Sequence, residues 1–306
     1  MDFFGLGPAA GSSPKFNFGE RETTAGISAS LPLVEWMRIV ATIEGLDPRI
    51  APSADPTSVR QNFTEATLPG LTTQPLFMHY DNLVEFHKLP EPPYDAIVTA
   101  GYSFYQALDS TRYSFGQFHL AGQATKKLHH NIEHAPGSFA SHFCPKTAKK
   151  AWTCDYGEFT FLGGTVLSRT GSGQAEPFYY QPTLGGQNIE GNETLRAYPN
   201  YRFRAPDTLL FQAEYSHDFG IHFEYKHKKD QWNETHRVDW HAFAAYMFYD
   251  AGTVGFTTAD LGLDRMRQDA GVGLKVKLAG TVAFHTYLAM GASGGPHWGF
   301  NFGKVL

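Results

Sequence analysis

Residues 185–219, GGQNIEGNETLRAYPNYRFRAPDTLLFQAEYSHDF, and residues 242–254, AFAAYMFYDAGTV, contain the pattern that decides the fold. The first stretch begins as a polar, glycine-rich loop that carries Arg196 and continues into a strand-like segment that presents Glu214. The second stretch is also strand-like and presents Asp250 close to its end. Two acids on strands and one arginine on a long loop suggest a loop that ion pairs hold inside a closed β-structure. This arrangement favours a membrane β-barrel over an enzyme pocket.

The composition of the 306-residue chain is compatible with a barrel. A chain of this length holds two ordinary domains or one large β-domain. A helical membrane protein would contain apolar runs of about 18 residues or more, and the sequence has none. Lipid-facing and lumen-facing residues alternate in a barrel, which accounts for a mean hydropathy of only −0.32. A soluble all-β protein would fit the composition as well.

Alternation with a period of two residues predicts about eleven strands. It is clear in 21–33, 94–104, 269–278 and 281–290, and weaker in 35–44, 76–88, 113–127, 158–169, 208–217, 242–250 and 298–306. Most of these segments could cross a bilayer at a tilt, which takes roughly 9–11 residues. Strands of soluble sandwiches are usually shorter, at about 5–6 residues. The lengths favour an all-β, antiparallel transmembrane β-barrel.

The connections between the predicted strands alternate in length. They are tight at 32–35 and 89–94, and long and polar at 47–74, 129–157, 171–206 and 253–268. Short turns at one end and long loops at the other are typical of membrane barrels. Loops beyond about 12–15 residues are uncommon in compact soluble domains.

The alternation of residues 208–217 predicts which face of the strand carries Glu214. The opposite face of that segment is apolar, with Leu209, Phe211, Ala213 and Tyr215. If the apolar face meets lipid, Glu214 points into the lumen, since a carboxylate facing lipid would be costly. A forked contact from Arg196 would satisfy this carboxylate. The register of Asp250 is less clear, because both faces of 242–249 are apolar or small. An alternative is that the three are unrelated surface charges.

Motifs for catalysis and cofactor binding are missing from the sequence. It contains no G-x-S-x-G elbow, and the segment 271–273 opens no helix that could hold a phosphate. His129, His130 and His134 could bind a metal, but they lie in a polar segment without helical register, so we interpret them as solvated loop residues. We therefore expect no enzyme activity, no cofactor and no metal site.

Charge, cysteines and the N-terminus bear on partners and compartment. A net charge of −5 gives no indication of nucleic-acid binding. Cys144 and Cys154 could form a loop disulfide in an oxidising compartment, or stay unpaired. Residues 1–16 lack the basic and apolar regions of a secretory signal, which an outer membrane barrel needs. We expect that the chain begins within a longer protein, or that the membrane interpretation is wrong.

Residues 195–198, LRAY, and residues 249–254, YDAGTV, resemble motifs of the C-terminal barrel of the BamA/TamA family, the bacterial surface antigen outer membrane proteins. In that family the longest loop folds back into the lumen and carries an arginine in a V-R-G-F or R-G-Y motif. This arginine contacts acids on the following strands, one of them in an aromatic-D-x-G-T-V segment. The resemblance implies a lumen-loop anchor of Arg196, Tyr198, Glu214, Asp250 and Gly252, with Gly185 and Gly186 at the start of the loop.

The chain departs from the family in strand number and at two motifs. The family barrel has sixteen strands preceded by POTRA domains, whereas about 11–12 strands and no POTRA domain are predicted here. Ala197 replaces the glycine of the arginine motif, and its Cβ requires a negative φ. The resemblance thus implies one outer membrane barrel domain, 1–306, truncated at the N-terminus, with 171–206 as the lumen-folding loop. It assigns the C-terminal strand to Trp298, Phe300, Phe302 and Leu306, where the family usually ends on an aromatic.

The resemblance also implies a function at the bacterial cell outer membrane. Family members assist the insertion or translocation of polypeptides, so the partners would be outer membrane lipids and unfolded outer membrane or secreted polypeptides. The mechanism would be physical, because an exposed strand edge templates an incoming strand by β-augmentation. The alternatives are a passive pore or structural surface protein without insertase activity, and a soluble all-β binding protein.

Overall fold

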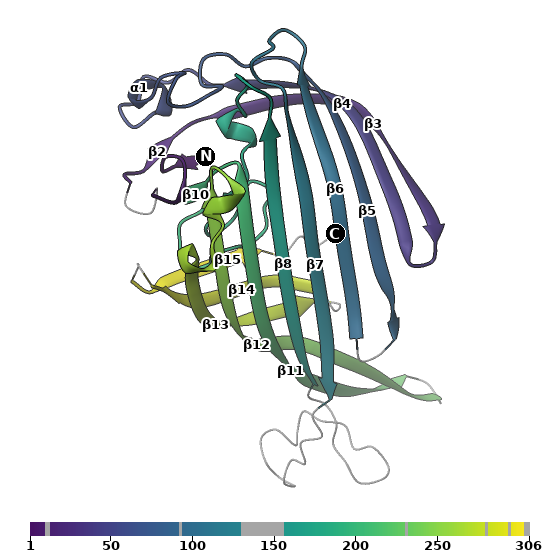
Figure 1. Cartoon of the computed structure of the whole chain (residues 1–306). Coiled ribbons are helices and arrows are strands. Elements are labelled where there is room, and N and C mark those ends of the chain that lie inside the picture. Colours follow the sequence, from purple (N-terminus) through teal and green to yellow (C-terminus); the bar gives the residue numbers. More distant parts are fainter. Residues whose placement is uncertain are drawn as a thin grey trace.

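The structure is a computed structural model that describes residues 1–9, 13–91, 94–129, 156–229, 232–278, 281–292 and 295–302. Eleven of its strands form one antiparallel sheet in the order β15-β14-β13-β12-β11-β8-β7-β6-β5-β4-β3, which curls around a lumen (Figure 1). The strands are β3 Glu20–Val34, β4 Met37–Ile50, β5 Phe77–Glu91, β6 Tyr94–Ala107, β7 Phe115–His129, β8 Tyr156–Thr170, β11 Asp207–Lys229, β12 Trp232–Gly255, β13 Arg267–Leu278, β14 Thr281–Gly291 and β15 His297–Phe302. The prediction of an all-β antiparallel barrel fold with about eleven strands is confirmed.

The strand register assigns each residue to the lumen or to the outer face. Paired residues share a face, and Gln212, Asp250 and Asp269 form one row across β11, β12 and β13. Glu214 lies on the same side of β11 as Gln212. The outer face of the C-terminal strands exposes large apolar side chains, which include Met247, Val272, Leu274, Leu288, Met290, Trp298 and Phe300.

The sheet is open rather than closed. In the part of the chain that the structure describes, β3 and β15 do not pair with each other and form the two edges. The sequence predicts a closed β-structure around the loop, and closure is not present within the described residues. The backbone donors and acceptors on the outer sides of these two strands are instead left for another partner or for solvent.

The hairpin of β11 and β12 is longer than the sequence pattern indicated. The polar segment between 219 and 242 continues the two strands, with Ile221 paired to Trp240 and Lys229 to Trp232. Its neighbours end earlier, since β8 pairs with β11 only as far as Asp218. Antiparallel pairing depends on backbone hydrogen bonds, so it continues where apolar alternation has ended.

A small cap lies over one end of the strands (Figure 1). It contains the ribbon of β1 Asp2–Phe3 and β2 Phe16–Asn17, and α1 Val59–Asn62 within the loop between β4 and β5. Phe3, Phe18 and Val59 of the cap pack against Phe178 and Tyr179 from the loop between β8 and β11. That loop also contains η3 Phe178–Tyr180, β9 Thr183–Leu184 and β10 Phe203–Arg204, while η4 Thr258–Asp260 and η5 Leu263–Arg265 follow β12. None of the helices in the described ranges is both long and apolar enough to cross a bilayer.

Candidate functional site

The loop of residues 171–206 folds against the lumen side of the sheet. Leu184, Leu195 and Phe203 of the loop share a buried apolar cluster with Tyr246 and Phe248 of β12. The cluster is continued by Ala197, Tyr198 and Ala205 from the loop and by Val254, Tyr287 and Ala289 from the sheet. The predicted position of this loop and its contact with the following strands are therefore present in the structure.

Gly185 and Gly186 shape the start of this loop. Their φ angles are +106° and +50°, in the region that favours glycine. A Cβ on Gly186 would lie 2.3 Å from Oδ1 of Asn200 and 2.9 Å from the carbonyl oxygen of Tyr198. Residues 186–195 then turn back on themselves, because the amide of Gly186 donates to the Leu195 carbonyl at 2.9 Å and the amide of Thr194 to Gly186 at 2.8 Å. This turn presents Arg196 to the sheet.

Arg196 binds both predicted acids. Its Nε and Nη2 donate to the two carboxylate oxygens of Asp250 at 2.8 Å each, which is a forked contact. Its Nη1 donates to Oε2 of Glu214 at 3.0 Å. The guanidinium also lies over the ring of Phe248, with 3.5 Å between Cζ and the ring centroid. The three residues Arg196, Glu214 and Asp250 are called the lumen-loop anchor below.

The anchor is buried and its charges are compensated. Asp250 is fully buried and Arg196 is 5% exposed. Burial alone would lower the pKa of the Arg196 guanidinium, but its hydrogen bonds to Asp250 and the charges of Asp250 and Glu214 raise that pKa. Removing one partner of such a pair leaves an uncompensated buried charge, which typically costs about 3–5 kcal/mol. The anchor therefore holds the loop in one position.

Tyr198 and Gly252 are packing positions beside the anchor. The ring of Tyr198 meets Phe203 edge-on, with 5.2 Å between the centroids. A Cβ on Gly252 would lie 2.9 Å from Cδ1 of Leu184, so the missing side chain lets β9 approach β12. Among described non-glycine residues only Tyr201 has a positive φ, so Ala197 has the negative φ that its Cβ requires.

Three residues that bind the anchor or the loop backbone beside it were not predicted from the sequence: Lys275, Asp269 and Gln212. Lys275 of β13 donates to Oε1 of Glu214 on the side opposite Arg196. Asp269 of β13 accepts the backbone amide of Ala197 at 3.2 Å. Gln212 of β11 donates to Asp250 at 3.1 Å and to the carbonyl of Thr194 at 3.2 Å. The signal was present, because Asp269 and Lys275 share the polar face of the alternating segment 269–278.

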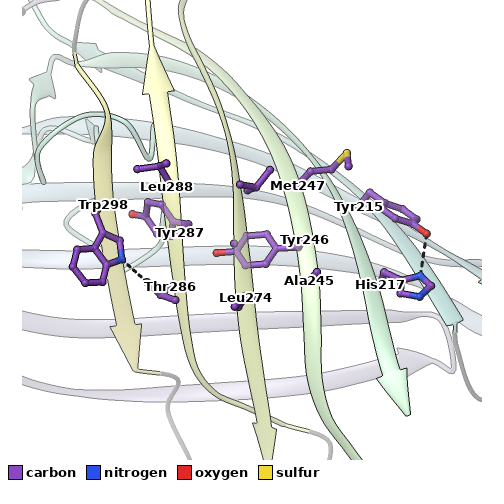
Figure 2. A pocket seen from close by; sticks show the side chains of 12 residues that line it. Tyr215, His217, Ala245, Tyr246, Met247, Leu274, Thr286, Tyr287, Leu288 and Trp298 are labelled. Carbon is purple, nitrogen blue, oxygen red and sulfur yellow. Dashed lines mark hydrogen bonds between the residues drawn. The ribbon is translucent and has the colours of Figure 1, made fainter. Parts of the chain in front are cut away.

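The aromatic residues of the C-terminal strand lie on the outer face. Trp298, Phe300 and Phe302 are more than half exposed, and Phe300 packs against Phe284 of β14 with 5.5 Å between the ring centroids. Figure 2 shows this face, where a hollow of about 550 Å³ extends from Tyr215 and His217 to Trp298. Its walls include Met247, Leu274 and Leu288.

Five residues for which the sequence suggested a role lie outside the described residues: His130, His134, Cys144, Cys154 and Leu306.

Comparison with known proteins addresses the fold. No protein-family model matches the chain, and no curated protein matches it. Among solved structures, the chain is similar to the crystal structure of BamA from Haemophilus ducreyi lacking POTRA domains 1-3, with a TM-score of 0.55 and 11% sequence identity. The similarity covers 94% of this chain. The chain has the fold of a BamA barrel.

The chain spans about half of that BamA structure, since the match covers 54% of its length. The BamA-like fold agrees with the resemblance stated from the arginine motif and the YDAGTV segment. At 11% identity the similarity concerns the fold and carries no activity with it.

Proposed function

We propose that this chain is an outer membrane β-barrel of the BamA/TamA type, which assists the insertion or translocation of polypeptides at the bacterial outer membrane. The observation that carries the proposal is the lumen-loop anchor within a BamA-like barrel fold. Arg196 reaches across to Asp250 with two hydrogen bonds of 2.8 Å and to Glu214 with one of 3.0 Å. A loop fixed inside the lumen stiffens the C-terminal strands while the edge of β15 stays accessible.

The proposed mechanism is physical and needs no cofactor. The backbone of β15 pairs with β14 on one side, and no described strand covers its other side. An incoming extended segment can add to such an edge by main-chain hydrogen bonds. The substrates would be unfolded outer membrane or secreted polypeptides, and nucleic acid is not an expected partner.

The outer face supports a location in a lipid bilayer. Large apolar side chains such as Ile27, Leu274 and Met290 are more than half exposed there, and extensive exposed apolar surface is typical of contact with a membrane or another protein. Outer membrane lipids would cover them. Cell fractionation with an antibody against β13–β15 tests this, and a signal confined to the soluble fraction would contradict it.

The decisive experiment is depletion of the protein in its source cell. We expect other outer membrane barrels to accumulate unfolded, which is seen as loss of their heat-modifiable folded bands on gels. An Arg196→Ala variant should complement the depletion poorly, and the exposed-site variant Arg38→Ala should complement it fully. Normal levels of folded barrels after depletion would refute the insertase function.

A passive pore is the second candidate, and the lumen face of the N-terminal strands favours it. Ser28 and Thr42 hydrogen bond to each other at 2.9 Å on that face, and Ser28 is exposed while Thr42 is partly exposed, which suits a water-filled passage. This candidate predicts stable ion conductance in planar bilayers together with no effect of depletion on other barrels.

A further inference from the structure

A second set of contacts joins the lumen loop to the last strand. Three residues before Arg196, the carboxylate of Glu193 lies beside His285 of β14 and Asn301 of β15. Oε1 of Glu193 is 2.8 Å from Nε2 of His285, which donates in its Nε2-protonated form, and 3.3 Å from Nδ2 of Asn301. Glu193 and His285 are largely buried, with side-chain exposures of 19% and 16%.

These contacts complete a pattern in the loop. The five residues 193–197 touch each of the five strands that follow the loop. Glu193 contacts β14 and β15, Arg196 contacts β11 and β12, and the amide of Ala197 contacts β13. Glu193 and Arg196 together link the anchor to β15, which is the free edge of the sheet.

We propose that Glu193, His285 and Asn301 form an edge latch, which holds β15 in register from the lumen side. The latch couples the separation of β15 from β14 to the position of the loop against the sheet. Glu193 is thus a positioning residue. The inference rests on the proposed function, because a held edge matters where that edge receives a strand.

The geometry of β15 explains why a latch is needed. The strand has six residues and pairs with β14 alone. Its lumen face consists of His297, Gly299 and Asn301, and the missing side chain of Gly299 leaves room for the ring of Tyr287, whose atoms would lie 2.0 Å from a Cβ at that position. Asn301 is the side chain of this face that hydrogen bonds to the loop. Short strands at a sheet edge open locally at low free-energy cost.

The imidazole of the latch is held in place by its neighbours. The His285 ring lies nearly parallel to Tyr287, at 6.2 Å between centroids, and meets the ring of Tyr246 edge-on at the same distance. Burial alone would raise the pKa of Glu193, but the hydrogen bonds from His285 and Asn301 and the charges of His285 and Arg196 together lower it. The carboxylate is thus charged and ready to accept both hydrogen bonds.

The outer face carries a contact that serves as a matched control. Nε1 of Trp298 donates to Oγ1 of Thr286 at 2.6 Å (Figure 2). This hydroxyl donates to the carbonyl of Gly299 at 3.0 Å. β15 is therefore fixed to β14 from outside without any involvement of the loop. Thr286→Val weakens the outer contact and leaves the latch intact.

Hydrogen–deuterium exchange of the purified protein in detergent micelles tests the latch. We expect Glu193→Ala to raise the exchange rate of amides in 297–302 about tenfold, while peptides of β11 and β12 change less than about twofold. Glu193→Gln retains an acceptor oxygen and should have a smaller effect. Glu190→Ala, at an exposed position on the same turn, should have none.

Two results would overturn the inference. One is unchanged exchange of β15 in Glu193→Ala; the other is an equal rise in β11 and β12, which would mean that the whole loop had come loose. Thr286→Val and Glu193→Ala should each raise exchange of β15, and should add in the double variant if the contacts are independent. The experiment does not use insertase activity. A confirmed latch with normal assembly of other barrels after depletion would leave the latch standing and refute the proposed function.

Discussion

On β12 the lumen-facing side chains of Tyr246, Phe248 and Asp250 are buried beneath the loop, whereas every residue of β3 from Arg21 to Val34 is exposed. The lumen side of β11–β14 is called the covered wall, and that of β3 and β4 the bare wall. In the sequence, β3 alternates clearly and β12 does not. On β12 the alternation fades because the loop covers the lumen face, where aromatic side chains such as Tyr246 and Phe248 are buried. β13 and β14 lie on the same covered wall and still alternate clearly in 269–278 and 281–290, so alternation alone does not distinguish a covered wall from a bare one.

The largest contrast should come from two arginines. Arg196→Ala removes the partner of the fully buried Asp250 and of the partly buried Glu214 on the covered wall, so we expect a loss of about 3–5 kcal/mol in the free energy of unfolding. On the bare wall, Nη2 of Arg38 donates to both carboxylate oxygens of Glu85, at 3.0 and 2.8 Å, in an exposed setting. Arg38→Ala should cost only about 0.2–1 kcal/mol.

Urea unfolding in detergent micelles measures both variants, with circular dichroism as the check that strand content is unchanged. Equal losses of unfolding free energy for the two arginine variants would contradict the distinction between the covered wall and the bare wall. Unchanged heat and protease resistance of Arg196→Ala would mean that the anchor does not stabilise the barrel.

A buried carboxyl group beneath the loop should make the free energy of unfolding depend on pH. Burial raises the pKa of Glu176, in the loop, from 4.5 to about 8, with a smaller contribution from the charge of Asp207. Between these values the folded state keeps a proton that the unfolded state releases, so stability falls as the pH rises through the window and is fully present below about 4.5. The slope is on the order of 1 kcal/mol per pH unit.

Glu176→Gln should remove this slope. The amide oxygen of glutamine can still accept the hydrogen bond that Nε2 of Gln117 donates to Glu176 at 2.6 Å. We expect the variant to match the wild type in urea midpoint near pH 4 and to exceed it at pH 8. Parallel pH profiles would show that Glu176 does not titrate in this range.

Two glycines sharpen the comparison at the level of packing. A Cβ on Gly271 of β13 would lie 2.4 Å from the carbonyl oxygen of Leu288 and 2.5 Å from the ring of Phe248, over which the guanidinium of Arg196 lies. Gly271→Ala should therefore cost about 1–3 kcal/mol. Gly122→Ala on β7, where the nearest atom would be 3.8 Å away, should stay within about 0.5 kcal/mol. Similar melting temperatures for the two variants would contradict this.

The smallest effect is expected on the bare wall. Thr42→Val removes the 2.9 Å hydrogen bond to Ser28 at an exposed site, where water replaces the lost partner. The free energy of unfolding should change by less than about 0.5 kcal/mol. A loss above about 1 kcal/mol would indicate that this part of the lumen is covered in the folded protein.

Much of the fold followed from local patterns in the sequence. Period-two alternation is a property of single strands, so it placed the eleven strands of the sheet to within a few residues except at the β11–β12 hairpin and at the end of β4, which continues to Ile50 instead of residue 44. It also placed Glu214 on the lumen side, because a carboxylate is costly against lipid. The contact of Arg196 with Glu214 and Asp250 came from a charge argument and from the resemblance of the YDAGTV segment.

The remaining contacts depend on register, which single strands do not reveal. Lys275 meets Glu214 because β12 and β13 pair with Tyr246 opposite Gly273. The latch needs both the turn of 186–195 and the pairing of His285 with Asn301. The open edges do not follow from alternation either, since alternation tells which face is apolar but says nothing of which strands remain unpaired. The family resemblance alone implied an exposed strand edge.

The order of the sheet has a consequence for how its gap can be bridged. β3 and β15 are the first and the eleventh strands of an uninterrupted antiparallel series, so their chains run in the same direction. Joined directly, they would form a parallel pair, with the slanted and less favourable bonds of that arrangement. Antiparallel pairing at both edges requires an odd number of additional strands, from this chain or from another molecule. Any such closure gives an even total, which is the parity of bacterial barrels.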